Sequence, residues 1–221
     1  MAMTDEEDEL HQREARLRAS LCGLYEIDPG LRRIEAAAGP LPFRARPEGF
    51  PALIRTLVGQ QLSPVAAEAI FRRLGANGEA LAPDYFLSRS DAELRAAGLS
   101  GQKIAYCRGL AEAVTTGALS FESLRSMPDD EAIAALTRLK GIGRWTAEIY
   151  LLFAIGREDV WPAADLALQV ACMHHLQLPD RPKERHLRDV AEAWRPYRSA
   201  AARLFWHYHG WLKASAAATP L

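Results

Sequence analysis

Apolar residues recur along most of the chain at the three- and four-residue spacing of helices that bury one face. No stretch shows the sustained alternation of Val, Ile or Thr with polar residues that a half-buried strand needs. The pattern therefore predicts an all-α protein. The expected helices cover residues 5–22, 31–38, 49–60, 63–74, 91–97, 101–116, 129–138, 143–155, 165–176, 183–194 and 197–212.

Several helix boundaries carry their own sequence signals. Ser63 is expected to cap a helix whose first residue is Pro64, where the missing proline N–H costs nothing. Ser120 and Asp129 mark the starts of further short helices, and segment 77–83 is expected to be a loop. Neither a long linker nor a repeat of fixed period is evident. We therefore expect one compact unit of two helical lobes with a cleft between them.

Composition and charge narrow the class of protein. The 221 residues are 49% hydrophobic, which is enough for a substantial core. No apolar run reaches the roughly 20 residues of a membrane span, and the N-terminus MAMTDEEDEL lacks the features of a signal peptide. We expect a soluble, cytoplasmic protein without a membrane partner.

The net charge of −1 is unusual for a protein that binds nucleic acid, but five acidic residues occupy positions 5–9. Of the 28 acidic residues, 23 remain outside this run, against 27 basic ones, which is a balance of +4. This excess permits DNA binding without demonstrating it.

Cysteine and histidine give no sign of a metal centre. Cys22, Cys107 and Cys172 lie far apart, match no metal-ligand spacing and are odd in number, so we interpret them as reduced and structural. The six histidines also show no ligand pattern. We expect neither a metal nor a cofactor.

A Gly-Ile-Gly turn, from Gly141 to Gly143, separates two helical patterns. Glycines at this spacing allow a positive φ and the close approach of another backbone, and the following helix begins with unpaired N–H groups that attract anions. Lys140 and Arg144 flank the turn and could add charge to a phosphate contact. The residues alone leave two interpretations open, an ordinary tight turn and a site that grips a DNA backbone.

Two longer segments resemble a known family. Residues 139–148, LKGIGRWTAE, resemble the helix-hairpin-helix of the base-excision DNA glycosylase superfamily, and residues 160–169, VWPAADLALQ, resemble its catalytic segment. Segments 53–63, 98–106 and 194–206 agree with the same family in the same order. Five motifs in order are specific, whereas any one of them is weak. The closest similarity is to the alkylpurine branch, the DNA-3-methyladenine glycosylase II family.

The resemblance covers roughly residues 30–212 and implies a domain organisation and an activity. We expect a helix-hairpin-helix glycosylase domain over residues 30–215, preceded by an acidic helical extension over residues 1–29. The implied function is monofunctional: hydrolysis of the N-glycosidic bond of alkylated purines, of the 3-methyladenine and 7-methylguanine type, in base-excision repair. The implied partner is double-stranded damaged DNA, bound by a monomer.

The resemblance also implies roles for individual residues. Asp165 is the implied catalytic carboxylate, Trp145 and Trp206 line the implied base pocket, and Gln61 is the implied wedge that fills the gap left by a flipped base. The implied DNA contacts are Lys103, Lys140, Gly141, Gly143, Arg144 and Thr146.

Each of these side chains also has a plainer interpretation. Asp165 stands where a helix pattern begins, so it could be only an N-cap. Trp206 points about 200° away from the apolar stripe that contains Leu204, which fits either a pocket or a helix buried on all sides. Trp145 could be ordinary core. Gln61 could be an exposed turn residue, and Lys103 could be a solvated lysine.

A single aspartate suits the implied chemistry. Cleavage of an N-glycosidic bond builds positive charge on the sugar, which a fixed carboxylate stabilises. A base alkylated at N3 or N7 is already cationic and departs without the second carboxyl group that ordinary glycoside hydrolysis needs. Many relatives have another acid directly before the catalytic one, where this chain has Ala164.

Two alternatives remain from the sequence. Superfamily members that act on oxidised pyrimidines or mismatched adenine commonly carry four clustered cysteines, a lysine two residues after the second hairpin glycine, or both, and this chain has neither. The other alternative is a DNA-binding module without catalysis. Activity alone separates that module from an enzyme.

Overall fold

The computed structural model describes residues 5–44, 46, 48–74 and 81–218. Within these ranges all regular secondary structure is helical, which confirms the predicted all-α class. The chain divides into two compact units. Unit 1 comprises Met1–Ala45 and Gly156–Leu221, and unit 2 comprises Arg46–Ile155.

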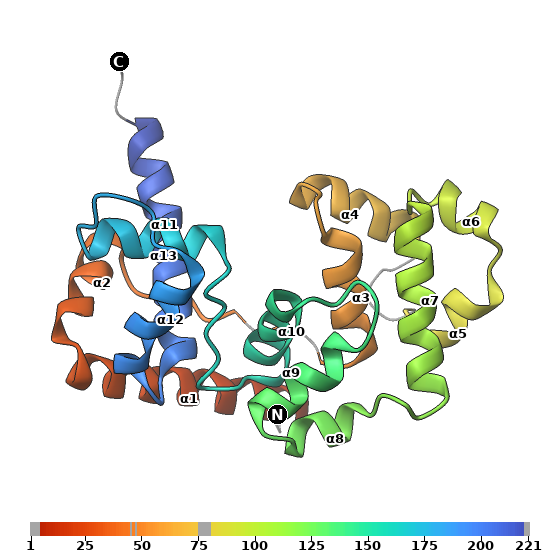
Figure 1. Cartoon of the computed structure of the whole chain (residues 1–221), viewed down its shortest axis with the longest axis horizontal. Coiled ribbons are helices and arrows are strands. Elements are labelled where there is room, and N and C mark those ends of the chain that lie inside the picture. Colours follow the sequence, from red (N-terminus) through yellow and green to blue (C-terminus); the bar gives the residue numbers. More distant parts are fainter. Residues whose placement is uncertain (1–4, 45, 47, 75–80, 219–221) are drawn as a thin grey trace. The chain divides into compact units, whose positions relative to one another are not determined.

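Unit 1 is organised around one long helix, α13, which packs against α1, α2 and α11 (Figure 1). Leu204 and Phe205 of α13 are fully buried, and the Phe205 ring lies 5.1 Å from the ring of Trp194. The elements of unit 1 are α1 (Asp5–Ile27), η1 (Pro29–Leu31), α2 (Arg32–Ala38), α11 (Leu166–His175), α12 (Glu184–Ala191), η3 (Glu192–Trp194) and α13 (Arg198–Ala218).

The first helix is longer than the pattern predicts. α1 continues to Ile27 rather than ending near residue 22. Leu24 and Tyr25 in its last turns are buried, so tertiary packing supports a segment with weak periodicity. Asp28 then caps η1 and also accepts a hydrogen bond from Trp194 Nε1 at 3.0 Å.

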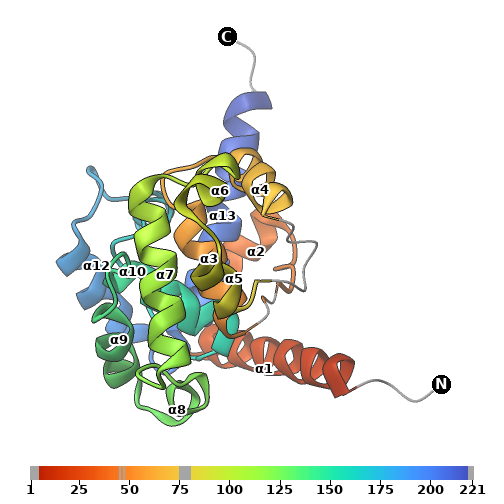
Figure 2. The ribbon, with the colours of Figure 1, turned by 90° about the vertical axis from the view of Figure 1, so that its right-hand side faces the viewer.

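Unit 2 is built on α7, which packs against α3, α5 and α6 (Figure 2). Ile104, Cys107 and Leu110 form the buried face of α7. The elements of unit 2 are α3 (Phe50–Gly59), α4 (Pro64–Arg73), α5 (Pro83–Ser88), α6 (Asp91–Ala96), α7 (Gly101–Thr115), α8 (Phe121–Ser126), α9 (Asp129–Thr137), α10 (Arg144–Tyr150) and the π-helix η2 (Leu151–Ile155).

The predicted helix starts agree with the structure in unit 2. Ser63 caps α4 and Ser120 caps α8 through their hydroxyl oxygens. Helix α5 was not predicted, because six residues are too short for periodicity and only Phe86 is anchored in the core. It begins at Pro83, inside the predicted loop; residues 77–80 of that loop lie outside the described residues.

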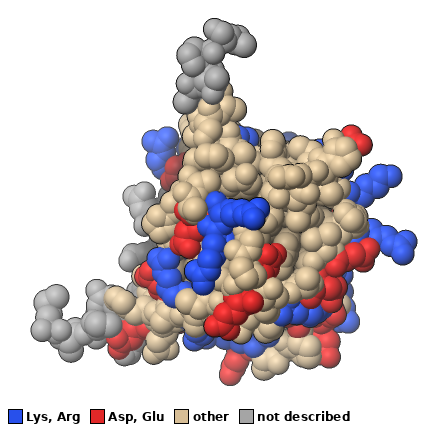
Figure 3. Space-filling view, turned by 90° about the vertical axis from the view of Figure 1, so that its left-hand side faces the viewer, with Lys and Arg blue, Asp and Glu red and all other residues tan. Residues whose placement is uncertain are grey.

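Charged side chains of both signs intermingle on the face of unit 1 shown in Figure 3. Among the helices of the described residues, none has the length and apolar character needed to cross a membrane.

Candidate active site and nucleic-acid interface

Asp165 stands at the N-terminus of α11 and caps it. Its Oδ1 accepts hydrogen bonds from the backbone N–H groups of Ala167 at 2.9 Å and Leu168 at 3.0 Å. The positive end of the helix dipole also favours negative charge at this position. The plain N-cap interpretation is therefore correct in geometry, and it fixes one carboxylate at the end of an irregular segment.

A tryptophan on another helix holds the same carboxylate. Trp206 Nε1, on α13, donates to Asp165 Oδ1 at 3.0 Å. Its neighbours Leu204 and Phe205 are fully buried, whereas the Trp206 ring is partly exposed, so α13 is not buried on all sides here. The structure thus brings together two of the predicted site residues, an aromatic face and a carboxylate.

His209 is a neighbour of this pair that the sequence analysis missed. It lies three residues beyond Trp206 on α13, and the spacing of three was the available signal. Burial lowers the pKa of His209, the charge of Lys213 lowers it further, and the charge of Asp165 acts in the opposite direction. The imidazole therefore has a smaller tendency to carry charge than an exposed histidine.

The predicted hairpin lies between α9 and α10 in unit 2. Gly141 has φ +88°, and a Cβ on it would lie 2.3 Å from Cδ2 of Tyr106, so only glycine fits. Gly143 is different. Its φ is −84°, and a Cβ on it would meet no heavy atom of the described residues within 4 Å. Internal packing thus explains glycine at position 141 and not at 143.

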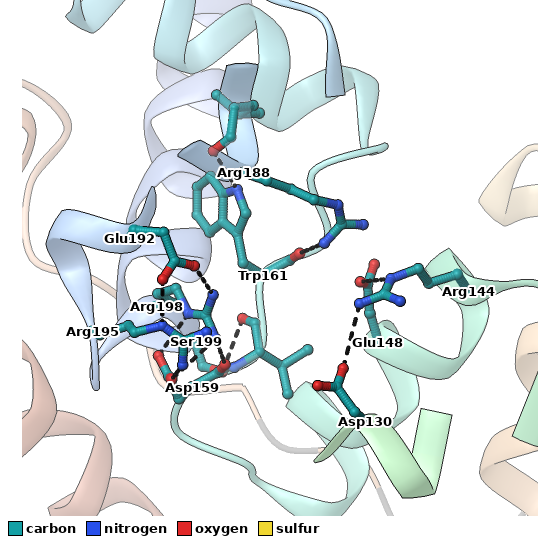
Figure 4. A network of polar contacts seen from close by, with 12 residues as sticks. Asp130, Arg144, Glu148, Asp159, Trp161, Arg188, Glu192, Arg195, Arg198 and Ser199 are labelled. Carbon is teal, nitrogen blue, oxygen red and sulfur yellow. Dashed lines mark hydrogen bonds and ion pairs between the residues drawn. The ribbon is translucent and has the colours of Figure 1, made fainter. Parts of the chain in front are cut away.

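The side chains beside the hairpin divide into exposed and internally bonded ones. Lys140 is exposed, as a phosphate contact requires. Arg144 donates to Glu148, which is 1% exposed, at 2.9 Å, and its other nitrogen lies 3.7 Å from Asp130 (Figure 4). A buried carboxylate needs a partner, and the guanidinium of Arg144 provides one for Glu148 within unit 2.

Thr146 and Lys103 take internal contacts that the sequence analysis did not predict. Thr146 is 3% exposed and its Oγ1 accepts from Gln60 Nε2 at 3.3 Å. Lys103 Nζ donates to the carbonyls of Val58 at 2.7 Å and Gln60 at 2.9 Å, and burial lowers its pKa. Lys103 therefore caps the C-terminal end of α3. The two interpretations from the sequence were a phosphate contact and a solvated lysine.

The turn between α3 and α4 carries the predicted wedge. Gln61 is exposed and has φ +58°, an uncommon and costly conformation for a residue other than glycine. Its neighbour Gln60 donates to the Gly141 carbonyl at 2.9 Å. Gln60 thus connects the wedge turn to the hairpin, and Lys103 in turn bonds the carbonyl of Gln60; the sequence offered no signal for these links.

Trp145, the other predicted pocket residue, lies on α10 in unit 2. It is 37% exposed, which is more than a core tryptophan shows, whereas Ile149 one turn further is buried. Among the described residues, no group of three or more His, Cys, Asp or Glu side chains is arranged to hold a metal ion.

Comparisons with known proteins agree with this geometry. The chain is 32% identical to DNA-3-methyladenine glycosylase 1 of Schizosaccharomyces pombe over an alignment of 206 residues. This alignment covers 91% of this chain and 90% of that protein. The structure of the S. pombe 3-methyladenine DNA glycosylase in complex with abasic DNA matches with a TM-score of 0.76 and 31% identity, over 85% of this chain and 95% of that one.

A crystal structure of DNA-3-methyladenine glycosidase from Bacillus halodurans matches with a TM-score of 0.78 and 32% identity, over 88% of this chain and 91% of that one. Residues 54–196, more than half of the chain, match the family described as HhH-GPD superfamily base excision DNA repair protein. This chain belongs to the HhH-GPD superfamily of base excision DNA repair proteins.

Proposed function

We propose that this protein is a monofunctional DNA glycosylase that hydrolyses the N-glycosidic bond of alkylated purines in double-stranded DNA and acts as a monomer. The main support is the hydrogen bond from Trp206 to Asp165, which holds a partly exposed aromatic face beside a carboxylate. The names of the similar proteins, 3-methyladenine glycosylases, indicate the same substrate class.

Asp165 supplies the charge that the reaction needs. As the bond between base and sugar breaks, positive charge develops on the sugar, and a carboxylate held in place stabilises it without reorganising. Three N–H donors fix Asp165 Oδ1, two from α11 and one from Trp206. The carboxylate can also orient the attacking water. An alkylated purine is a cationic leaving group, so one carboxylate is sufficient.

Trp206, in unit 1, and Trp145, in unit 2, are each proposed as a ring on which a flipped base can stack. A cationic purine over a tryptophan face gains cation–π attraction in addition to stacking. Partial exposure of both rings leaves faces for this contact. Discrimination against undamaged purines then follows from charge, because a neutral base gains less from the same ring.

The hairpin is proposed to contact a DNA phosphate through the N-terminus of α10, with Gly143 at the point of closest approach. The open space around Gly143 supports this role, because no described residue lies close enough to require glycine there. Lys140 adds positive charge from the exposed side of the turn. Gln61, presented by the strained turn, is proposed as the wedge.

The first expected result is release of alkylated purines without strand cutting. Strand-cutting relatives use a lysine two residues after the second hairpin glycine, where this chain has Trp145, and Arg144 stays protonated and is a poor nucleophile. A methylated duplex incubated with the protein should release 3-methyladenine or 7-methylguanine, and nicks should appear only after alkali. A borohydride-trapped complex would mean that another amine attacks the sugar. No released base at all would favour the non-catalytic module.

The second expected result separates the two tasks of Trp206. Trp206→Phe keeps a ring but removes the N–H that donates to Asp165, and single-turnover release should slow about tenfold. Trp206→Ala also removes stacking, worth about 1–3 kcal/mol per base, and should slow release further, while affinity for undamaged DNA changes little. Trp211→Ala, on the exposed side of the same helix, is the control and should be neutral. Equal rates for the Phe and Ala variants would refute base stacking on Trp206.

A further inference from the structure

The backbone leading to Asp165 is irregular. Residues 156–165 connect η2 to α11 without helical hydrogen bonding along their length. The peptide groups of such a segment need other partners when they are buried, and Val160 and Trp161 within it are both buried. The position of the carboxylate therefore depends on what holds this segment.

The first turn of α13 holds the start of the segment. Ser199 N–H donates to the Glu158 carbonyl at 2.9 Å. The buried Ser199 hydroxyl accepts from Val160 N–H at 2.9 Å and lies 3.2 Å from the Val160 carbonyl oxygen, to which it donates. Arg198 donates to the Asp159 carbonyl at 2.9 Å. Three consecutive peptide groups are thus bonded to two consecutive residues of one helix. Figure 4 shows Arg198 and Ser199 beside Asp159.

An ion pair reinforces this attachment. Arg198 Nε and one terminal nitrogen donate to the two carboxylate oxygens of Asp159, at 2.7 and 3.0 Å, and the other terminal nitrogen donates to Glu192 at 2.9 Å. The Arg198 side chain is only 15% exposed, so water screens this pair weakly. Arg195 bonds the same two carboxylates, but its side chain is 51% exposed, and it bonds the side chain of Asp159 rather than its carbonyl. Exposed pairs of this kind contribute little.

The same helix also holds the end of the segment. Trp206, seven residues and about 10 Å beyond Ser199 along α13, donates to Asp165. The middle is tied to the neighbouring helix, where Trp161 Nε1 donates to the Leu187 carbonyl at 3.1 Å. One helix, α13, therefore bonds both ends of the segment that leads to Asp165.

We infer that Arg198 and Ser199 are positioning residues, which fix the segment of residues 158–160 and thereby the hydrogen bond between Trp206 and Asp165. They act through the backbone and have no contact with the reacting atoms. The effect on rate rests on the proposed glycosylase function. The effect on the hydrogen bond does not rest on that function. An experiment can therefore refute the positioning role and the proposed function independently.

The direct test observes the indole N–H of Trp206 by NMR in the protein without DNA. Trp206→Phe assigns the resonance. In Arg198→Gln and Ser199→Ala the resonance should move toward the position of an indole exposed to water, and in Arg195→Gln it should stay in place. An unchanged resonance in both Arg198→Gln and Ser199→Ala would overturn the inference, whatever reaction the protein catalyses.

The second test measures single-turnover release from a methylated duplex at a temperature where each variant is folded. Arg198→Gln should slow release about 10- to 100-fold, because small misplacements of a reacting group are costly, while the Kd for undamaged duplex stays within about twofold. Arg198→Lys should recover part of the rate by restoring the charge opposite Asp159 without the fork of the guanidinium.

Arg195→Gln, the matched control, should retain the wild-type rate within about twofold, since exposed ion pairs contribute little. A folded Arg198→Gln with the wild-type rate would contradict positioning, and a loss of melting temperature alone would show a merely structural role. If Arg198→Gln does not fold, the rate of single-turnover release and the Kd for undamaged duplex are measured for Ser199→Ala instead, and they test the positioning role in the same way. A shifted Trp206 resonance in a protein that releases no base would support the positioning and refute the proposed function.

Discussion

Replacing Asp165 with asparagine is expected to lower the rate of base release by about a thousandfold or more, because it removes charge that acts mainly in the transition state. The asparagine Oδ1 can accept the same bonds from Ala167, Leu168 and Trp206, and asparagine caps helices as well as aspartate does. Folding and DNA affinity should therefore stay close to those of the wild type. Single-turnover kinetics on a methylated duplex, with melting temperature and DNA binding measured in parallel, give the result.

The chain provides a matched control for this substitution. Asp28 also caps a helical turn in unit 1 and also accepts a hydrogen bond from a tryptophan, Trp194. Asp28 accepts from Gly30 on one oxygen and from Trp194 on the other, so Asp28→Asn loses one of these bonds and should cost some stability, but the rate of the folded protein should stay unchanged. Asp165→Ala, which removes the cap as well, should cost about 1 kcal/mol of stability in addition. Near-normal turnover by Asp165→Asn would exclude Asp165 as the catalytic carboxylate.

Gly143→Asp is expected to weaken binding to every duplex, damaged or undamaged, by about 100-fold at low salt, because it sets a negative charge against a phosphate. The stability of the protein without DNA should not decrease. Gly143 is the N-cap of α10, its φ of −84° suits any residue, and aspartate is a better N-cap than glycine by a few tenths of a kcal/mol. Binding isotherms and thermal unfolding should thus change in opposite directions.

Gly143→Ser distinguishes charge from size at the same position. Serine is a good N-cap without charge, so its binding should fall less than that of Gly143→Asp, and the difference between them should shrink as salt rises. Gly141→Ala should affect the folded protein itself rather than its binding to DNA. Its Cβ would collide with Tyr106, so it should lose stability before DNA is added. Wild-type affinity of folded Gly143→Asp for undamaged duplex would refute the hairpin contact.

The sequence by itself determined the helices and the family. Helix starts depend on residues within one turn, so the caps at Ser63 and Ser120 and the turn at Gly141 were predictable from neighbours alone. The order of five motifs identified the family, and the comparisons confirm it. Short or weakly periodic elements were missed, namely α5 and the last turns of α1, because their support comes from buried side chains rather than from local pattern.

Only the tertiary structure decided what each polar side chain contacts. Lys103 meets the carbonyl of Gln60, 43 residues away, and Trp206 meets Asp165, 41 residues away. Such partners are set by how helices pack, which a local pattern does not contain. The same reason explains why Lys103 and Thr146 matched motif positions for DNA contact and yet bond internally. It also explains why Arg198, to which the sequence assigned no role of its own, holds the backbone that leads to Asp165.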